Sequence, residues 1–470
     1  MNLPNALTKP PLIQKIQWIA DPVGYMESAA QEHPDLFSAQ VLGFGDSFVF
    51  VNDPKGIQEI LTNDRRTFAA LGKGNNTLEP LLGNHAIVML DGDRHKRRRQ
   101  LLMPPFHGER MRAYGQLIKT LTQKVFADLP LGQPFAARTA MQEISLQVIL
   151  QAVFGLYEGE RCQQLKHLLA ALSDLFESPL KASFLLLPWL QKDLGAWSPW
   201  GRFLRQRQQI DQLIYAEIAE RRANPDPGRI DILSLLMSAQ DEAGQPMSDQ
   251  ELRDELMTLM LAGHETTATA MAWALYWIHA LPEIRAKLLP ELDTADDAVE
   301  TRLPYLNAVC QETLRIHPVA MLTFPRVVQT PTELLGHPLE PGMVVMGCIY
   351  TLHQREDLYP EPKQFRPERF LTHQFSPYEF MPFGGGARRC IGEALAQFEM
   401  KLVLTEILAR YELELVDNRL EKPQRRGVTL APGRGVQMKI TGKRQQQVKP
   451  GRDVACNVST RFGVTPGHHS

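Results

Sequence analysis

The chain has few cysteines and almost no net charge, and both shortages narrow the classes of protein to which it can belong. Its 470 residues contain five cysteines, an odd number without paired short spacings. This pattern argues against a disulfide framework and favours a reduced protein. The formal net charge of -2 gives no global attraction to nucleic acid or to an anionic membrane. We therefore expect a cytoplasmic protein with no nucleic-acid partner.

Long hydrophobic runs are also missing. Residues 1–22 lack the apolar core of roughly 7–15 residues that a signal peptide carries. Residues 256–281 are apolar almost throughout, but His264 and Glu265 interrupt them. No stretch there reaches the about 20 uncharged apolar residues that span a bilayer. We expect a helix buried in protein at this place, and no transmembrane segment.

Local patterns predict a mainly helical chain with a smaller β region. Residues 47–51 (SFVFV) are rich in strand formers, and Asp53 with Pro54 supplies a cap and a first-turn proline for a helix. Ser248 and Glu251 have the spacing of a capping box that opens the buried helix. Further helices are expected over residues 94–128, 140–154, 200–222, 305–317 and 391–411, and further strands over 343–346 and after 412.

The composition changes near residue 440. From Thr441 to Ser470 the chain loses bulky apolar residues and gains Lys, Arg, Gln and Gly, a composition typical of disorder. We find no internal repeat. Although the length allows two or three domains, we expect a single domain over residues 1–440 and a polar, disordered tail over 441–470.

The stretch FGGGARRCIG (residues 383–392) places Cys390 behind three glycines and just before an expected helix. Glycines let the backbone approach a flat ligand, and helix N–H groups favour the thiolate that binds metal. No other Cys or His stands at zinc-ligand spacing, so a cofactor would have to complete a metal site, as the porphyrin nitrogens of haem do. A buried cysteine in a glycine-rich turn is the alternative that spacing alone leaves open.

These residues carry a family resemblance. Phe383, Gly386, Arg388, Cys390 and Gly392 fit the F-x-x-G-x-R-x-C-x-G haem-binding signature of the cytochrome P-450 superfamily at every fixed position. Three other stretches resemble motifs of the family in the expected order: AGHETT (262–267), ETLR (312–315) and FRPERF (365–370). The resemblance spans about residues 54–440. It implies the cytochrome P-450 fold, haem b as cofactor, and a soluble bacterial-type haem-thiolate monooxygenase.

By this resemblance, Cys390 is the thiolate ligand of the iron and takes part in oxygen activation. The other residues expected at the haem are His95, Arg99, Ala262, Arg326, Phe383 and Arg388. His95 and Arg99 are four apart, so both can point at one haem propionate. Without the resemblance, the basic run over residues 94–99 that contains them would be interpreted as a solvated helix face.

Glu265 and Thr266 lie within the apolar helix, where an ionisable group needs a reason. The resemblance makes them catalytic residues that hold water and relay protons during oxygen activation. Read alone, the Thr266 hydroxyl bonds to the carbonyl four residues earlier and bends the helix. His264 and Glu265 also begin like the zinc motif H-E-x-x-H, but Ala268 replaces the second histidine, so we discard zinc.

Glu312 and Arg315 share a helix face, which usually means a surface ion pair. The resemblance instead buries them with Arg369 in a structural cluster that supports the haem pocket. The substrate pocket is expected to include Ala262, Val319, Ala320 and Met321. Residues 184–190 (FLLLPWL) form a further apolar patch, which fits a substrate entrance, a membrane surface or ordinary core.

The expected reaction is hydroxylation or epoxidation of a lipophilic substrate, a fatty acid or a terpenoid, by O2. The chain has no second glycine-rich cofactor motif, so electrons are expected from a ferredoxin and its NAD(P)H reductase. An acidic carrier would be drawn to Lys96, Arg97, Arg98 and Arg389. We expect a monomer, with peripheral membrane contact left open. Two alternatives remain: an enzyme that uses peroxide or rearranges hydroperoxides, and a non-enzymatic haem sensor.

Overall fold

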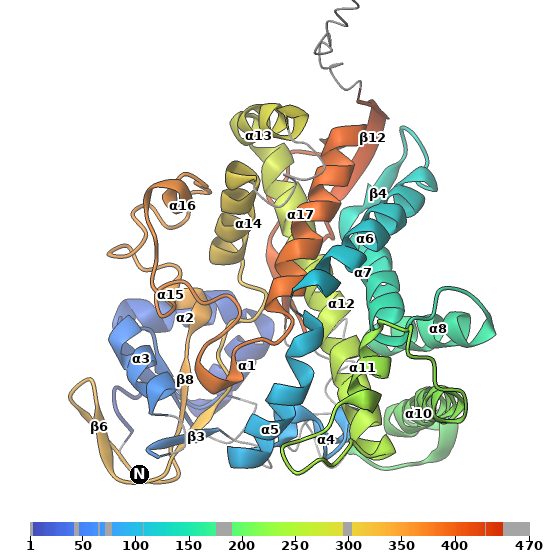
Figure 1. The fold of residues 1–470 in the computed structure, drawn as a ribbon. Coiled ribbons are helices and arrows are strands. Elements are labelled where there is room, and N and C mark those ends of the chain that lie inside the picture. The colour runs from blue at the N-terminus through green and yellow to red at the C-terminus, as the bar shows by residue number, and fades with distance from the viewer. Residues whose placement is uncertain are drawn as a thin grey trace, which may run out of the picture.

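Helices form most of the molecule, and short strands gather beside them in small sheets, as the mainly helical pattern of the sequence predicts (Figure 1). The computed structural model describes residues 3–41, 47–63, 66–70, 78–106, 108–174, 190–294, 303–427 and 429–444. Among these residues, no helix combines the length and the apolar character needed to cross a membrane.

The helices are α1 (Pro11–Ala20), α2 (Pro22–Glu32), α3 (Pro54–Thr62), α4 (Glu79–Leu82), α5 (Gly92–Leu102), α6 (Glu109–Ala127), α7 (Ala137–Phe154), α8 (Glu160–Asp174), α10 (Pro199–Ala223), α11 (Ile232–Ser238), α12 (Asp249–Ala280), α13 (Pro282–Thr294), α14 (Pro304–Ile316), α15 (Ile349–Leu352), α16 (Arg369–Thr372) and α17 (Glu393–Arg410). Short 3-10 turns are η1 (Ile87–Met89), η2 (Pro104–Phe106), η4 (Gly195–Trp197) and η5 (Gly386–Arg388).

The strands are β1 (Leu36–Ala39), β2 (Phe48–Val51), β3 (Phe68–Ala70), β4 (Pro134–Ala136), β5 (Arg326–Val328), β6 (Thr332–Leu334), β7 (His337–Leu339), β8 (Val344–Gly347), β9 (Tyr411–Leu415), β10 (Pro423–Arg426), β11 (Thr429–Pro432) and β12 (Gln437–Lys443). The largest sheet has the order β1-β2-β8-β5-β3, and only the β2–β8 pair in it is parallel. The predicted strands at 47–51 and 343–346 are therefore neighbours in this sheet.

The long helix α12 runs through the middle of the helical body, along α7 and next to α17 (Figure 1). Its start is the predicted capping box: the amide of Glu251 donates to the Ser248 hydroxyl at 3.3 Å, and the Ser248 amide donates to the Glu251 carboxylate at 2.9 Å. Most of its side chains are buried by the neighbouring helices. The prediction of a helix buried in protein at 256–281 is confirmed.

One predicted helix is wrong in its extent. The helix expected over 94–128 is broken into α5 and α6, because Pro104 and Pro105 lack the N–H groups that would continue α5. Strand β12 pairs with β9 as far as Lys443. The division into a domain over residues 1–440 and a tail over 441–470 stays a prediction. Residues 445–470 lie outside the described residues.

Candidate active site

The loop that carries Cys390 is shaped by its glycines. The amide of Cys390 donates to the carbonyl oxygen of Phe383 at 3.0 Å, which closes the loop before α17 begins. Gly384 and Gly386 have φ values of 68° and 63°, a conformation that favours glycine. A Cβ atom on Gly386 would also lie 2.9 Å from the Leu61 carbonyl oxygen. The glycines therefore let this loop press against α3.

Cys390 is exposed to solvent as a residue, although protein surrounds its thiol on most sides. Burial raises the pKa of its thiol, and the N–H groups of Gly392 and Glu393 lower it by less. The N–H groups at the helix start therefore favour the thiolate, as expected, but burial outweighs them. A metal ion that displaces the thiol proton would supply the thiolate instead.

His95 and Arg99 lie one turn apart on α5, next to the cysteine loop. His95 is buried, and Arg99 donates to the carbonyl oxygen of Arg389 at 2.7 Å. Burial lowers the pKa of Arg99, and the nearby Cys390 raises it. A cavity of about 550 Å³ lies here, lined by His95, Lys96, Arg99, Gln100, Met103, Pro104 and Ala387. The two residues expected to bind a propionate thus share one hollow beside the loop.

Two other arginines predicted to contact haem make contacts with backbone carbonyl groups. Arg388 donates to the carbonyl oxygens of Ile87, at 3.1 Å, and of Leu90, and so ties the cysteine loop to η1. Arg326 is buried on β5 and donates to the carbonyl oxygen of Phe324 at 3.0 Å. Their contacts with haem stay predictions.

Arg98 does not lie on the basic surface to which the sequence assigned it. It is buried on the inner side of α5, where it donates to Glu255 at 2.7 Å and also pairs with Glu251. These ion pairs fix α5 to the first turns of α12. Lys96 and Arg97 are exposed as expected, so the positive surface of α5 is smaller than the sequence suggested.

Glu265 and Thr266 are held by different neighbours on α12. The Thr266 hydroxyl donates to the carbonyl oxygen of Ala262 at 2.7 Å, which leaves its oxygen lone pairs available to accept a hydrogen bond. The Glu265 carboxylate turns toward α7, where it pairs with Arg138 and accepts a hydrogen bond from Gln142 at 2.6 Å. The acid and the alcohol are therefore adjacent in sequence but anchored separately.

Sequence reasoning missed Arg138 and Gln142. Arg138 stands 127 residues before Glu265, and the helix predicted from residue 140 did not include it. Its amide also donates to the carbonyl oxygen of Gly435 at 3.0 Å, so the turn before β12 fixes the start of α7. Nothing in the local pattern distinguishes this arginine from a solvated one, because its partner comes from tertiary packing.

The structure brings Glu312, Arg315 and Arg369 together. Arg315 donates to Glu312 through Nε at 2.7 Å and through Nη2 at 2.8 Å, and Arg369 donates to the same carboxylate at 3.3 Å. All three side chains are buried. Arg315 also donates to the carbonyl oxygen of His353 at 2.8 Å. The cluster locks α14 to the segment that precedes the cysteine loop.

The residues expected in the substrate pocket differ in their exposure to solvent. Val319 and Met321 are buried after α14, whereas Ala320 is exposed and pairs with Thr429 in an isolated bridge. Ala262 is exposed on α12. Their union in one pocket stays a prediction. The apolar patch 184–190 lies outside the described residues except for Leu190.

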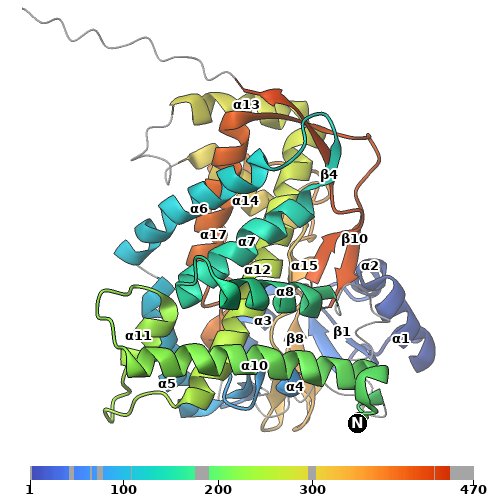
Figure 2. The ribbon, with the colours of Figure 1, turned by 90° about the vertical axis from the view of Figure 1, so that its right-hand side faces the viewer.

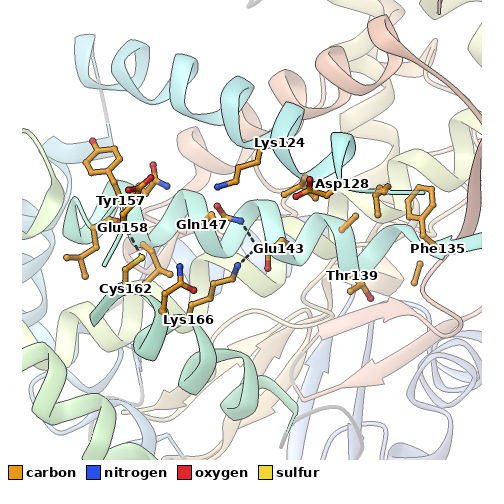
Figure 3. Close-up of a pocket in the computed structure, with 18 residues that line it drawn as sticks. Lys124, Asp128, Phe135, Thr139, Glu143, Gln147, Tyr157, Glu158, Cys162 and Lys166 are labelled. Atoms are coloured by element: carbon orange, nitrogen blue, oxygen red, sulfur yellow. Dashed lines mark hydrogen bonds and ion pairs between the residues drawn. The ribbon is translucent and has the colours of Figure 1, made fainter. Parts of the chain in front are cut away.

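A larger cavity, of about 810 Å³, lies elsewhere, among α6, α7, α8 and β4 (Figure 3). The Lys166 ammonium and the Gln147 amide both contact Glu143 within it. None of the residues that the sequence singled out lines this cavity. Cavity size alone would therefore misplace the site.

The donor set at Cys390 fits haem. Within the described ranges, no group of three or more His, Cys, Asp or Glu side chains could hold a metal ion. A metal at this one thiol must therefore bring its other ligands with it, as iron in a porphyrin does. The cationic Arg99 beside the thiol suits the carboxylates that haem also carries.

Comparisons with known proteins agree with this assignment. The family model named Cytochrome P450 matches residues 4–439. Cytochrome P450 135B1 of Mycobacterium tuberculosis is 35% identical over 92% of this chain and 90% of its own length, and cytochrome P450 135A1 of the same species is 32% identical over 94% and 96%. These names give the family and no substrate.

Solved structures show the same fold. Cyanobacterial CYP120A1, bound to retinoic acid, superposes with a TM-score of 0.81 at 23% identity, covering 94% of this chain and 99% of that one. The haem domain of cytochrome P450DA superposes with a TM-score of 0.79 at 22% identity, covering 94% and 98%. The fold predicted by resemblance is confirmed, and the chain belongs to the cytochrome P450 family.

Proposed function

We propose that this cytochrome P450 uses O2 to hydroxylate or epoxidise a lipophilic small molecule, with electrons from a ferredoxin and its NAD(P)H reductase. Members of the family bind haem through a cysteine thiolate and act as monooxygenases. When bound, haem b supplies the iron at which dioxygen is activated. The observation that carries the proposal is the presence, in one chain, of the Cys390 loop and of Glu265 and Thr266 on α12.

The proposal gives the two α12 residues separate tasks. The Thr266 hydroxyl donates to Ala262, so its oxygen can accept a hydrogen bond from a water molecule and hold that water near the reacting oxygen. Glu265 exchanges protons with solvent, and Arg138 and Gln142 fix the direction of its carboxylate. This acid and alcohol pair favours O2 with reductive activation over the use of peroxide.

The substrate class rests on the apolar character of the expected pocket. Val319 and Met321 are buried apolar side chains, and Ala262 leaves space on α12. The retinoic acid in the CYP120A1 structure shows that this fold, in that protein, holds a long apolar acid. We therefore propose a fatty acid or a terpenoid as substrate.

The electron carrier would bind near α5 and the cysteine loop. Lys96, Arg97 and Arg389 are exposed there, although Arg389 also pairs with Glu393 at 2.6 Å. An acidic ferredoxin fits this positive surface. A cytoplasmic monomer is part of the same proposal.

An optical titration tests the proposal. Purified ferric protein is titrated with a panel of fatty acids and terpenoids while the Soret band is followed. A saturable shift with one class, followed by NAD(P)H-dependent product formation with ferredoxin and reductase, is the expected result. A haem-thiolate Soret band with no shift for any member would contradict the substrate class. A shift with turnover by peroxide alone would contradict the electron supply.

A further inference from the structure

Helix α1 turns aliphatic side chains outward and a polar side chain inward, the opposite of an ordinary surface helix. Leu12, Ile13, Ile16 and Ile19 are 69%, 44%, 55% and 37% exposed, whereas the polar Gln14 is buried on the inner side. A helix that packs only against its own protein normally turns its aliphatic side chains inward. Figure 2 shows α1 at the edge of the molecule, beside α2 and β1. Its outer face therefore carries an exposed apolar stripe, which consists of Leu12, Ile13, Ile16 and Ile19.

The inward position of Gln14 is fixed by four hydrogen bonds. Its amide nitrogen donates to the carbonyl oxygens of Lys9, at 2.7 Å, and Leu7, at 3.4 Å. Its amide oxygen accepts from the Tyr25 hydroxyl at 3.0 Å and from the Gln40 amide at 2.9 Å. Trp18 is buried on the same side. Rotation of α1 to bury the stripe would break all four bonds, so the exposure is built into the fold.

The stripe is bordered by positive charge. At about 100° per residue, Ile19, Leu12, Ile16 and Ile13 span roughly 120° of the helix surface. Lys15 lies beside one edge, and Gln17 lies beside the other, where it accepts a hydrogen bond from Lys9 at 3.3 Å. No acidic residue stands within α1. Lysines on both borders of an aliphatic stripe are typical of helices that lie in the head-group region of anionic lipid.

The stripe is a poor fit for a protein partner. A helix of ten residues is about 15 Å long, so its face is well below the roughly 800 Å² per partner of a stable protein interface. It also lacks the Trp, Tyr and Arg side chains that dominate such interfaces. A lipid surface needs neither shape complementarity nor aromatic anchors, and it gains from each buried aliphatic group.

We infer that α1 docks the folded protein onto an anionic lipid surface, with Leu12, Ile13, Ile16 and Ile19 in the acyl boundary and Lys9 and Lys15 at the head groups. The helix would lie in the plane of the membrane rather than cross it. This inference depends on neither the substrate nor the reaction of the enzyme.

Vesicle flotation tests the inference with the full-length, haem-loaded protein. The probes are vesicles of phosphatidylcholine with phosphatidylglycerol, and vesicles of phosphatidylcholine alone. We expect the protein to float with the anionic vesicles. The double variant Leu12→Gln, Ile16→Gln should lower the partition coefficient at least tenfold, and Lys9→Gln, Lys15→Gln should remove the preference for anionic lipid.

The matched control is Leu131→Gln. Leu131 is 67% exposed, close to the 69% of Leu12, and stands in the chain between α6 and β4. Strand β4 lies far from α1 in both ribbon views. This variant should float like the parent protein. Flotation that is absent from the parent, or unchanged in the double variant, would overturn the inference. A concentration-dependent dimer that the double variant dissociates would assign the stripe to a second copy of the chain instead. An unchanged Soret band in each variant verifies that the fold is intact.

Discussion

Arg138, at the start of α7, forms an ion pair with Glu265 in the middle of α12. The pair joins a buried arginine to the residue that we propose as the acid in oxygen activation. Gln142, one turn further along α7, holds the second carboxylate oxygen at 2.6 Å. The direction of the Glu265 carboxylate is therefore set by α7 and not by α12 itself.

Replacement of Arg138 should uncouple NAD(P)H consumption from product formation. Arg138→Gln removes a charge-assisted hydrogen bond from Glu265, which is worth about 1.5–3 kcal/mol. We expect the yield of product per NAD(P)H to fall roughly tenfold, and Arg138→Lys to restore part of it. Lys166→Gln is the matched control. It breaks another ion pair to α7, between Lys166 on α8 and Glu143 on α7, and neither of these residues contacts Glu265. Equal losses in Arg138→Gln and Lys166→Gln would mean that Arg138 acts only on stability.

Thr266→Ala should uncouple the reaction for a different reason. The variant loses the hydroxyl that is expected to hold water, so NAD(P)H consumption should continue while product falls on the order of tenfold. Thr266→Ser should recover the yield. Thr267→Ala serves as control, since the Thr267 hydroxyl makes the same kind of bond, to Gly263 at 2.9 Å, but is buried. Full coupling in Thr266→Ala would contradict the role assigned to this residue.

The Glu312 cluster should matter for folding and haem retention, not for the chemistry. Glu312→Gln leaves Arg315 and Arg369 buried without a carboxylate, and we expect a loss of about 3–5 kcal/mol in the free energy of unfolding. Denaturant unfolding and the haem content of purified protein measure this effect. Arg366→Gln is a suitable control, because the Arg366 side chain pairs with Glu361 at 2.8 Å on the surface. A stable, haem-loaded Glu312→Gln protein would count against the structural role.

His317 should destabilise the protein in acid. Its ring stacks on Trp273 with centroids 3.7 Å apart, and burial lowers its pKa from 6.5 to about 3. Between these values the unfolded chain binds a proton that the native state does not, so stability falls as the pH drops below about 6.5.

The variant His317→Phe removes this titration and keeps an aromatic ring on Trp273. At pH 5 we expect it to lose about 2 kcal/mol less of its pH 7 unfolding free energy than the parent loses. Denaturant unfolding at the two pH values measures the difference. The exposed His373, changed to Phe, should leave the pH dependence as it is. If His317→Phe loses as much unfolding free energy between pH 7 and pH 5 as the parent does, the acid sensitivity belongs to other groups.

The sequence identifies the parts of the site that a short motif carries. The Cys390 loop, the α12 pair and the Glu312 cluster were all expected by residue number, because each depends on local spacing or on a family pattern. The capping box of Ser248 and Glu251 was found for the same reason. Such features are fixed within one turn or one loop.

Contacts between distant segments could not be predicted in this way. Arg98 has the same neighbours in sequence as Arg97, yet packing turns it inward to Glu255 while Arg97 stays exposed. The pairing of Arg138 with Glu265 and the outward face of α1 likewise depend on how helices meet. The helix start at Cys390 was expected to favour the thiolate and does so, but burial, which no local pattern reveals, outweighs it.

The central claim is that Cys390 is the thiolate ligand of haem iron, and the carbon monoxide difference spectrum of the reduced protein tests it most directly. The parent protein and Cys310→Ala, which alters a buried cysteine on α14, should both give the thiolate-type Soret band. Cys390→Ser should bind haem weakly or give only a band of the histidine-ligated type. A thiolate-type band that persists in Cys390→Ser, or that is missing from folded, haem-loaded parent protein, would contradict the account.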